Sequence, residues 1–211
     1  MIRKSFAGAV LVGALVSMTA CSTHTRVRMP PRLDLRSLGS IGMLEFSPSS
    51  GGQLNVEASR ELVAVVHSAQ PGVPTLELGA EQQILASLGH HTMDAEAVRA
   101  IGKKHHVDVL LVGTLDARRI KPSIRLGRDT ESVSASAEIE GALTMRRYDT
   151  RSGATLWSAA SRGSERLASI HVAGGGLAGI GAYDPQGAES RMVRGLVYRA
   201  TDDFRPYWVR Q

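Results

Sequence analysis

The chain has 211 residues, of which 43% are hydrophobic, 21% are charged and 4% are aromatic, and its formal net charge at pH 7 is +5. Basic and acidic residues are mixed along the chain and the aromatic content is low, so the composition argues against a nucleic-acid partner. Cys21 is the only cysteine, which excludes an intramolecular disulfide. The length suffices for one domain with a substantial core.

The first twenty residues have the order of a secretory signal. Arg3 and Lys4 precede an apolar stretch from residue 6 to residue 16, and small residues lead up to Ala20. The apolar stretch spans about a dozen residues, fewer than the ~20 that a membrane-spanning helix needs. We therefore expect residues 1–20 to be a cleaved signal peptide.

The segment Met18-Thr19-Ala20-Cys21 resembles the lipobox of bacterial lipoproteins, in which an apolar residue and two small residues precede the acylated cysteine. The resemblance implies lipid, including palmitate, on Cys21 and attachment of the mature protein to a membrane. An ordinary signal peptide with a chance cysteine is the alternative. Ser22 stands where an Asp favours retention in the inner membrane, so the same resemblance indicates an outer-membrane anchor facing the periplasm.

The mature chain is predicted to begin with a tether. Residues 21–37 contain Pro30-Pro31, Thr and Arg and show no apolar periodicity, which is typical of an extended segment. We expect a single domain over residues 38–211. Its first element is the apolar run 41–46, which predicts a buried strand followed by a polar loop.

Strands and helices alternate through the first half of this domain. Apolar residues at helical spacing predict a helix with Asn55 as its cap. A second strand is expected at 74–79, and a short helix at 81–88. Asp94 is the expected cap of a third helix. Such alternation is typical of an α/β fold.

Two apolar patterns predict the centre of the sheet. Residues 107–115 are almost uniformly apolar, which indicates a central strand covered on both faces. Residues 133–146 alternate between apolar and polar, which indicates an antiparallel or edge strand. A turn at 149–153 and a strand at 155–160 complete a hairpin. We therefore expect an α/β (α+β) fold, with a mixed sheet of about five strands, an antiparallel hairpin and flanking helices.

The C-terminal part is expected to be a loop followed by a helix. Residues 173–181 are rich in glycine and predict a loop, and Asp184-Pro185 predicts the start of a helix that Pro206 ends. The aromatic residues around Pro206 either dock a partner or close the core beneath this helix. The candidate partner-binding residues are Phe204, Tyr207, Trp208, Ile170, Leu177 and Ile180.

Two segments carry a resemblance to a known superfamily. MDAEAVRAIGKKHHVDVLLVGTL at 93–115 and MRRYDTRSGATLWSA at 145–159 resemble motifs of the periplasmic lipoproteins that include CsgG, LpoB and the N-terminal domain of TolB. The resemblance covers residues 40–208, with Ser152 where Thr is commoner. It implies a CsgG/TolB-N-like domain that interacts with another envelope protein or forms a homo-oligomer.

Within this superfamily, CsgG forms an oligomeric pore through two membrane hairpins. The corresponding segments here are 117–131, which is charged, and 161–183, which is rich in glycine. The basic cluster in the first segment is expected to be a solvated loop, and the second would give arms shorter than the about 9 to 11 residues of a membrane strand. An adaptor or assembly role is therefore favoured over a pore.

The sequence contains no recognised catalytic or cofactor motif. His90-His91 and His105-His106 lack the spacing to carboxylates that a zinc site requires, and we expect both pairs at helix ends. The glycines 174–176 lack the Lys-Ser/Thr ending of a phosphate loop. We therefore expect no cofactor and no metal, and a non-enzymatic interaction or assembly module. The alternatives are an oligomeric secretion or transport component of the outer membrane, and an envelope enzyme or small-ligand binder.

Overall fold

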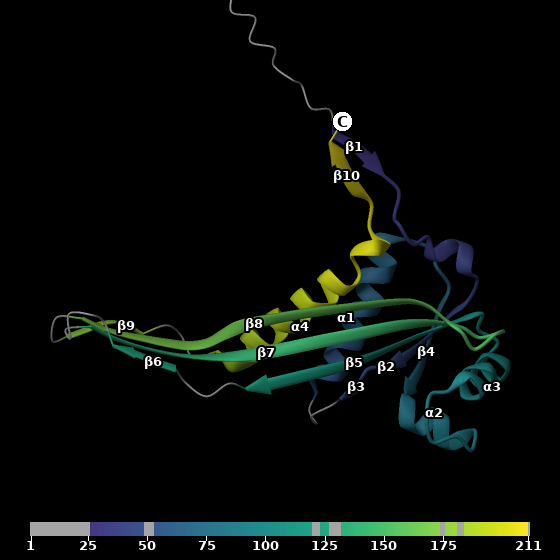
Figure 1. Ribbon diagram of the computed structural model, residues 1–211, viewed down its shortest axis with the longest axis horizontal. Coiled ribbons are helices and arrows are strands. Elements are labelled where there is room, and N and C mark those ends of the chain that lie inside the picture. Colours follow the sequence, from purple (N-terminus) through teal and green to yellow (C-terminus); the bar gives the residue numbers. More distant parts are fainter. Residues whose placement is uncertain are drawn as a thin grey trace, which may run out of the picture.

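The computed structural model describes residues 26–48, 53–119, 123–126, 132–173, 176–180 and 184–210. The expected signal peptide and the expected lipidation site, Cys21, lie outside these residues. The described part of the chain forms an eight-stranded sheet with helices on both faces, and a two-stranded ribbon that projects from the body (Figure 1).

The five strands expected from the sequence are all present and lie next to one another in the order β4-β2-β5-β7-β8. The pairs β2–β4 and β2–β5 are parallel, whereas β5–β7 and β7–β8 are antiparallel. The predicted α+β class, with a mixed sheet, an antiparallel hairpin and flanking helices, is therefore confirmed. The strands span Ile41–Glu45 (β2), Thr75–Ala80 (β4), Val109–Arg119 (β5), Ser132–Asp149 (β7) and Thr155–Ala173 (β8).

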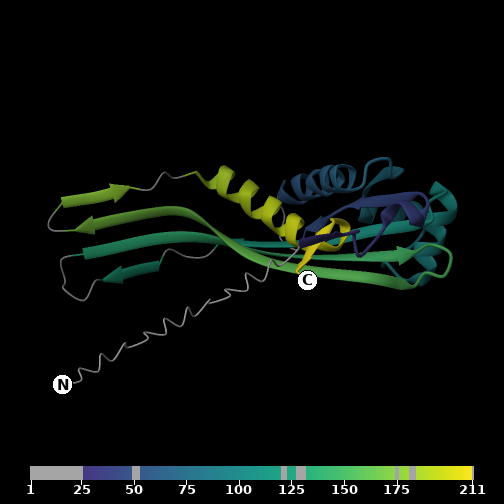
Figure 2. The same ribbon diagram turned by 90° about the horizontal axis from the view of Figure 1, so that it is seen from above.

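Three further short strands enlarge the sheet. They are β3 (Ser47–Pro48), which pairs with β5, β6 (Ser123–Leu126), which pairs with β7, and β9 (Gly176–Ile180), which pairs with β8. We expected loops at 117–131 and 173–181. This prediction is wrong for the residues that form the end of β5, β6 and β9. Because β7 and β8 are 18 and 19 residues long, they reach beyond the helices and carry β6 and β9 at their far end (Figures 1 and 2).

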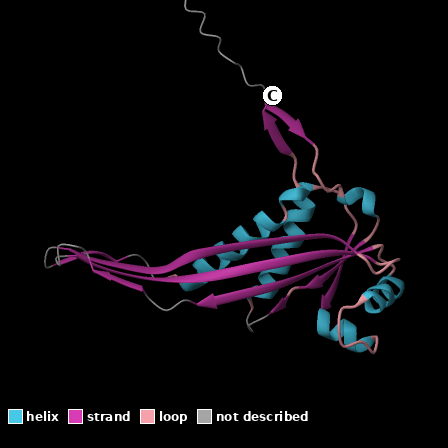
Figure 3. Ribbon diagram, viewed as in Figure 1, coloured by secondary structure: helices cyan, strands magenta, loops and turns pink. Residues whose placement is uncertain are grey.

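Two helices cover each face of the central strands, as the secondary-structure colouring makes clear (Figure 3). The helices α1 (Leu54–Ala69) and α4 (Pro185–Ala200) pack on one face, and α2 (Glu81–Ser87) and α3 (Ala95–His105) on the other. In β5, Leu111 belongs to the first core and Leu110 to the second, so the predicted two-sided burial of this strand is confirmed. None of the described helices is long and apolar enough to cross a membrane.

Two of the three predicted helix caps are observed. Asp94 accepts a hydrogen bond from the N–H of Ala97, and Asp184 caps α4 with a proline behind it. The third prediction is wrong, because Asn55 lies inside α1, which begins at Leu54. The Asn55 amide instead donates to a carboxylate oxygen of Glu45 at 2.9 Å, at the end of β2.

The segment expected to be a tether contains regular structure. Strand β1 (Arg26–Met29) pairs antiparallel with β10 (Tyr207–Arg210), and a short 3₁₀ helix, η1 (Leu35–Leu38), follows β1. Leu35 is fully buried in the core beside α1 and α4. The folded part therefore begins by residue 26 instead of residue 38, because the two ends of the chain pair with each other.

Candidate functional site

The most distinctive surface is the terminal ribbon, which we define as β1 together with β10. Its register pairs Arg28 with Trp208 and Met29 with Tyr207. Neighbouring residues of a strand point to opposite faces, so Arg26, Arg28 and Trp208 share one face of the ribbon. Both arginines are exposed, and Trp208 is 63% exposed, the largest value among the large hydrophobic side chains of the described chain.

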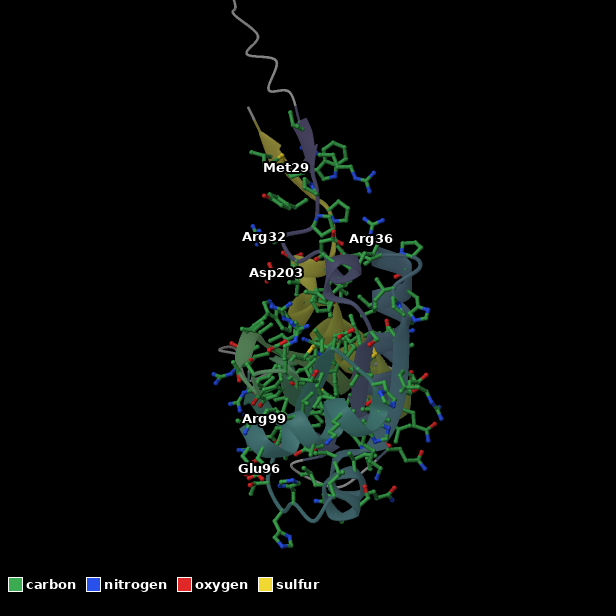
Figure 4. The ribbon with its side chains drawn as sticks, turned by 90° about the vertical axis from the view of Figure 1, so that its right-hand side faces the viewer. Met29, Arg32, Arg36, Glu96, Arg99 and Asp203 are labelled. Atoms are coloured by element: carbon green, nitrogen blue, oxygen red, sulfur yellow. The ribbon has the colours of Figure 1, made fainter. Side chains whose placement is uncertain are left out.

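Asp203 joins the two chain ends at the base of the ribbon. Its carboxylate accepts a hydrogen bond from the indole Nε1 of Trp157 at 3.0 Å and lies 3.4 Å from the guanidinium of Arg32. Its backbone oxygen accepts from the N–H of Leu33. The Arg32 guanidinium also lies 4.8 Å from the centre of the Tyr207 ring. Figure 4 shows Arg32 and Asp203 directly below Met29 on the ribbon.

Gln70, immediately after α1, forms a second junction between the two ends. Its side chain is buried, and its oxygen accepts a hydrogen bond from the N–H of Leu35 at 2.7 Å. Its amide nitrogen donates to the carbonyls of Leu33 and Phe204. Sequence reasoning did not identify Gln70, because a glutamine at a helix end has no local signature of a buried role.

Phe204 belongs to the core and not to a partner surface. It lies in the 3₁₀ helix η2 (Asp202–Phe204), is fully buried, and contacts Trp157 with ring centres 5.2 Å apart. The structure thus assigns it the core-closing role, the alternative to the partner-binding candidate. Of the three aromatic residues in this segment, only Trp208 is exposed, because Tyr207 is half-buried beneath the Arg32 guanidinium.

A shallow hollow of about 470 Å³ lies where the ribbon meets the end of α1. Arg205 in this hollow is already engaged, because its guanidinium donates to the carbonyl of Tyr198 at 2.6 Å and stacks on that ring. Within the described residues, Arg28 has no such hydrogen bond or ion pair. The hollow is lined by Arg28, Ser68, Ala69, Arg205, Pro206 and Trp208.

The remaining partner-binding candidates lie on the far part of the sheet. Ile170 in β8 is paired with Ile180 in β9, and Leu177 is paired with Val172. The backbone thus brings these three candidates together on adjacent strands, away from the terminal ribbon. Their side chains lie outside the described part of the structure.

Two other hollows lie on the sheet face that carries α2 and α3. One, of about 550 Å³, contains the ion pair between Asp116 and Arg118 together with Glu140 and Arg162. The other, of about 310 Å³, lies between Glu81, the middle of β5 and the C-terminal part of β7. Both combine acidic and basic side chains, and neither contains a Ser or Cys next to a histidine base that would form a nucleophilic site.

Three carboxylates with lowered pKa values have structural roles. The pKa of Asp94 is lowered by the hydrogen bond from the Ala97 N–H, and that of Asp108 by the hydrogen bond from the Ser40 N–H. The side-chain hydrogen bond from Ser152 lowers the pKa of Asp149. Each hydrogen bond stabilises the ionised carboxylate, so a helix cap at Asp94, a contact between the starts of β2 and β5 at Asp108, and a turn at Asp149 account for these shifts. None of the three carboxylates lines the hollows described above.

The motif that resembles the superfamily hairpin has a packing role. Gly153 adopts a φ of +78° in the turn after β7, and a side chain there would meet the backbone oxygen of Ala95. Thr150 in the same turn donates to the carbonyls of Val107 and Asp108. The turn therefore attaches the β7–β8 hairpin to the start of β5.

His105 and His106 end α3, as predicted, with His106 in the left-handed conformation at the C-cap. Within the described residues, no group of three His, Cys, Asp or Glu side chains has the geometry to hold a metal ion.

No family model matches the chain, and no curated protein matches its sequence. Solved structures with similar folds include the PelC dodecamer from Paraburkholderia phytofirmans, with 12% identity, a TM-score of 0.44, and coverage of 86% of this chain and 96% of that one. A neuraminyllactose-binding hemagglutinin homolog from Helicobacter pylori has 8% identity, a TM-score of 0.48, and coverage of 82% and 84%.

The C-terminal domain of LpoB from Escherichia coli, one of the proteins that the sequence motifs resemble, also matches. It has 15% identity, a TM-score of 0.34, and coverage of 60% of this chain and 82% of that one. At these identities and TM-scores, the similarities assign neither a family nor an activity to this chain.

Proposed function

We propose that this chain is a lipid-anchored protein of the cell envelope whose periplasmic domain acts non-enzymatically as an interaction or assembly module. The lipid is attached at Cys21, and the membrane is the outer membrane. The observation that carries the proposal is the position of the terminal ribbon. Its first residue, Arg26, follows the lipobox cysteine by five residues and is paired with the C-terminal strand.

This arrangement supports an anchored module because four residues lie between Cys21 and the ribbon, and the ribbon is joined to the core. The ribbon is joined to the body at Asp203, whose backbone oxygen accepts from the N–H of Leu33. It is also joined through Gln70, which binds backbone groups of both Leu35 and Phe204. A domain connected in this way is held close to its membrane. It differs from a domain on a long flexible tether, which samples a large volume.

The non-enzymatic part of the proposal is supported by the roles of the perturbed groups. Catalytic sites concentrate groups with shifted pKa values in a cleft. Here Asp94, Asp108 and Asp149 cap a helix, join two strands and form a turn, respectively. The two hollows on the sheet face combine acidic and basic side chains, whereas the charged residues that line the hollow at the ribbon base are Arg28 and Arg205.

Radiolabelled palmitate incorporation together with membrane fractionation tests the anchor. The unaltered chain is expected to incorporate label and to sediment with outer membranes, because the thiol of Cys21 receives the lipid. Cys21→Ala should lose the label and become soluble, whereas the matched control Ser22→Ala should retain both. Continued labelling of Cys21→Ala would overturn lipid attachment at this residue.

Photo-crosslinking in the native envelope tests the interaction role. Leu156 is a suitable position for the crosslinker, because it is 57% exposed on β8. We expect a discrete adduct with another envelope protein, and no equivalent adduct from the exposed control position Glu77 on β4. The absence of any adduct from several exposed positions would contradict the interaction role.

A homo-oligomeric component of the envelope is a second candidate. The observation in its favour is the long extension of β7 and β8, flanked by β6 and β9, which projects beyond the helices (Figure 2). Such an extension offers strand edges to a second copy. A single monomeric mass for the detergent-solubilised lipidated protein, measured by light scattering, would count against this candidate.

A further inference from the structure

The terminal ribbon combines basic, aromatic and apolar residues in two four-residue strands. One face carries Arg26, Arg28 and Trp208, and the pairs Val27–Val209 and Met29–Tyr207 occupy the other. Neither strand contains an acidic residue. A two-stranded ribbon in water has marginal stability by itself, so a contact that covers the exposed indole of Trp208 would stabilise this one.

The distance to the expected lipid limits what that contact can be. Arg26 follows Cys21 by five positions, and an extended chain covers at most ~3.6 Å per residue. The Cα atom of Arg26, at the tip of the ribbon, is therefore no more than ~18 Å from the Cα atom of Cys21, roughly the depth of one leaflet and its headgroups. Arg26 lies at this tip, whereas Met29 lies towards the body.

The chemistry of the ribbon matches the headgroup layer of a phospholipid membrane. Trp and Tyr side chains concentrate at membrane interfaces, where the ring is apolar and its polar edge is wet. Arginine binds phosphate oxygens through charge-assisted hydrogen bonds, and basic residues near an anionic surface each contribute about 1 kcal/mol. Arg28 has no competing acidic partner within the described residues and borders the hollow beside Trp208.

The other exposed hydrophobic side chains do not share this position. Leu76 lies on β4 and Leu156 lies near the start of β8, so neither is on the terminal ribbon. Tyr198 lies in α4 and is covered on one side by Arg205. Among the exposed large hydrophobic side chains of the described residues, Trp208 and Val209 are the two on the terminal ribbon.

We propose that the terminal ribbon binds the phospholipid headgroups of the membrane to which the Cys21 lipid is attached, with Trp208 at the interface and Arg26 and Arg28 on lipid phosphates. This inference rests on the proposed lipid anchor. The ribbon adds a second point of attachment and thereby sets the orientation of the domain. The far ends of β7 and β8 leave the body in a different direction from the ribbon, so they remain accessible to other proteins (Figure 1).

Fluorescence quenching tests this inference, because the chain contains only two tryptophans, Trp157 and Trp208. The lipidated full chain carrying Trp157→Phe is reconstituted into vesicles of phosphatidylethanolamine and phosphatidylglycerol (3:1), with bromine on the acyl carbons nearest the headgroup. We expect bromine to reduce Trp208 emission at least twofold. The matched control Trp208→Phe retains only Trp157, which lies at the ribbon base, and should be quenched far less.

Flotation of the same vesicles separates the two proposals. If the protein floats and Trp208 is not quenched, the anchor stands and the ribbon inference is overturned. If the lipidated protein does not float, the anchor itself is wrong and the inference fails with it. Reversing both charges, with Arg26→Glu and Arg28→Glu, should leave flotation unchanged and reduce the quenching at least twofold.

A second label covers the case in which Trp157→Phe does not fold. The lipid occupies the sulfur of Cys21, so Arg210→Cys introduces the only free thiol, at the position that the ribbon register pairs with Arg26. An environment-sensitive dye on this thiol should shift its emission to shorter wavelength on vesicles. An unshifted emission on floated protein would overturn the inference.

Discussion

Phe204 and Trp208 stand four residues apart in one aromatic segment, and the structure places them in opposite environments. Phe204 is fully buried against Trp157, whereas Trp208 is 63% exposed on the terminal ribbon. Between them, Arg205 is anchored to Tyr198, and Pro206 precedes the ribbon strand. The segment thus divides at Pro206 into a part that stabilises the domain and a part that is available for contact.

The same division separates the two ends of the N-terminal segment. Leu35 is fully buried and its N–H binds Gln70, whereas Arg26 and Arg28 are exposed. The residues at the ribbon base therefore join the chain ends to the core, whereas the ribbon itself carries exposed side chains. Substitutions in the two regions should have very different effects on stability.

The largest effect is expected for Phe204→Ala. Removing a fully buried aromatic ring creates a cavity, which typically costs about 3–5 kcal/mol of unfolding free energy. Phe204→Leu should recover part of this loss, because it refills much of the volume. Urea unfolding followed by circular dichroism measures both variants, and an unaltered stability for Phe204→Ala would contradict the core role.

A smaller loss is expected for Gln70→Leu. This variant leaves the N–H of Leu35 and the carbonyls of Leu33 and Phe204 without their buried partner, which costs about 2–3 kcal/mol. Gln83→Leu on the exposed face of α2 is the matched control and should change the stability by less than about 0.5 kcal/mol. Equal effects of the two substitutions would show that Gln70 does not join the chain ends.

Lowering the pH should reduce the free energy of unfolding of the domain and leave the charges of the ribbon arginines unchanged. Hydrogen bonds in the folded state lower the pKa values of Asp108 and Asp149. Their contribution to the free energy of unfolding is therefore fully present above the pKa of the unfolded chain, about 3.9. It is lost as the pH falls through the lower folded pKa. Asp108→Asn should flatten this acid dependence in thermal melts between pH 6 and pH 3, whereas the exposed control Glu77→Gln should follow the unaltered chain. An Asp108→Asn profile identical to that of the unaltered chain would exclude this linkage.

The smallest effect on stability is expected for Trp208→Ser. The side chain is largely exposed, so the free energy of unfolding should change by no more than about 0.5 kcal/mol. The same variant should lose most of the interaction with headgroups, because it removes the interfacial ring. A stability loss as large as that of Phe204→Ala would mean that the ribbon belongs to the core.

The periodic elements could be predicted because their patterns are local. An alternating pattern, as over 133–146, predicts a strand with one buried face. A uniformly apolar run, as at 107–115, predicts a strand that is buried on both faces, and both segments form strands of the expected kind. The caps Asp94 and Asp184 were predictable for the same reason, since a cap binds a backbone N–H only three residues away.

The errors concern segments whose conformation depends on a distant partner. The glycine-rich stretch around Leu177 has low intrinsic strand preference, yet β9 forms because β8 offers it a hydrogen-bonding edge. Asn55 was expected to cap a helix, but the nearby Glu45 carboxylate binds its side chain instead. Neither partner can be recognised from the neighbouring residues.

The sequence by itself determined the order of strands and helices, the mixed character of the sheet, and the lipobox that predicts where the protein is anchored. Only the tertiary structure decided that Arg26–Met29 pairs with Tyr207–Arg210, and that Phe204 is core whereas Trp208 is surface. Strands of four residues are too short to carry a periodic signal, and their pairing joins opposite ends of the chain. The surface next to the expected lipid therefore exists only in the folded molecule.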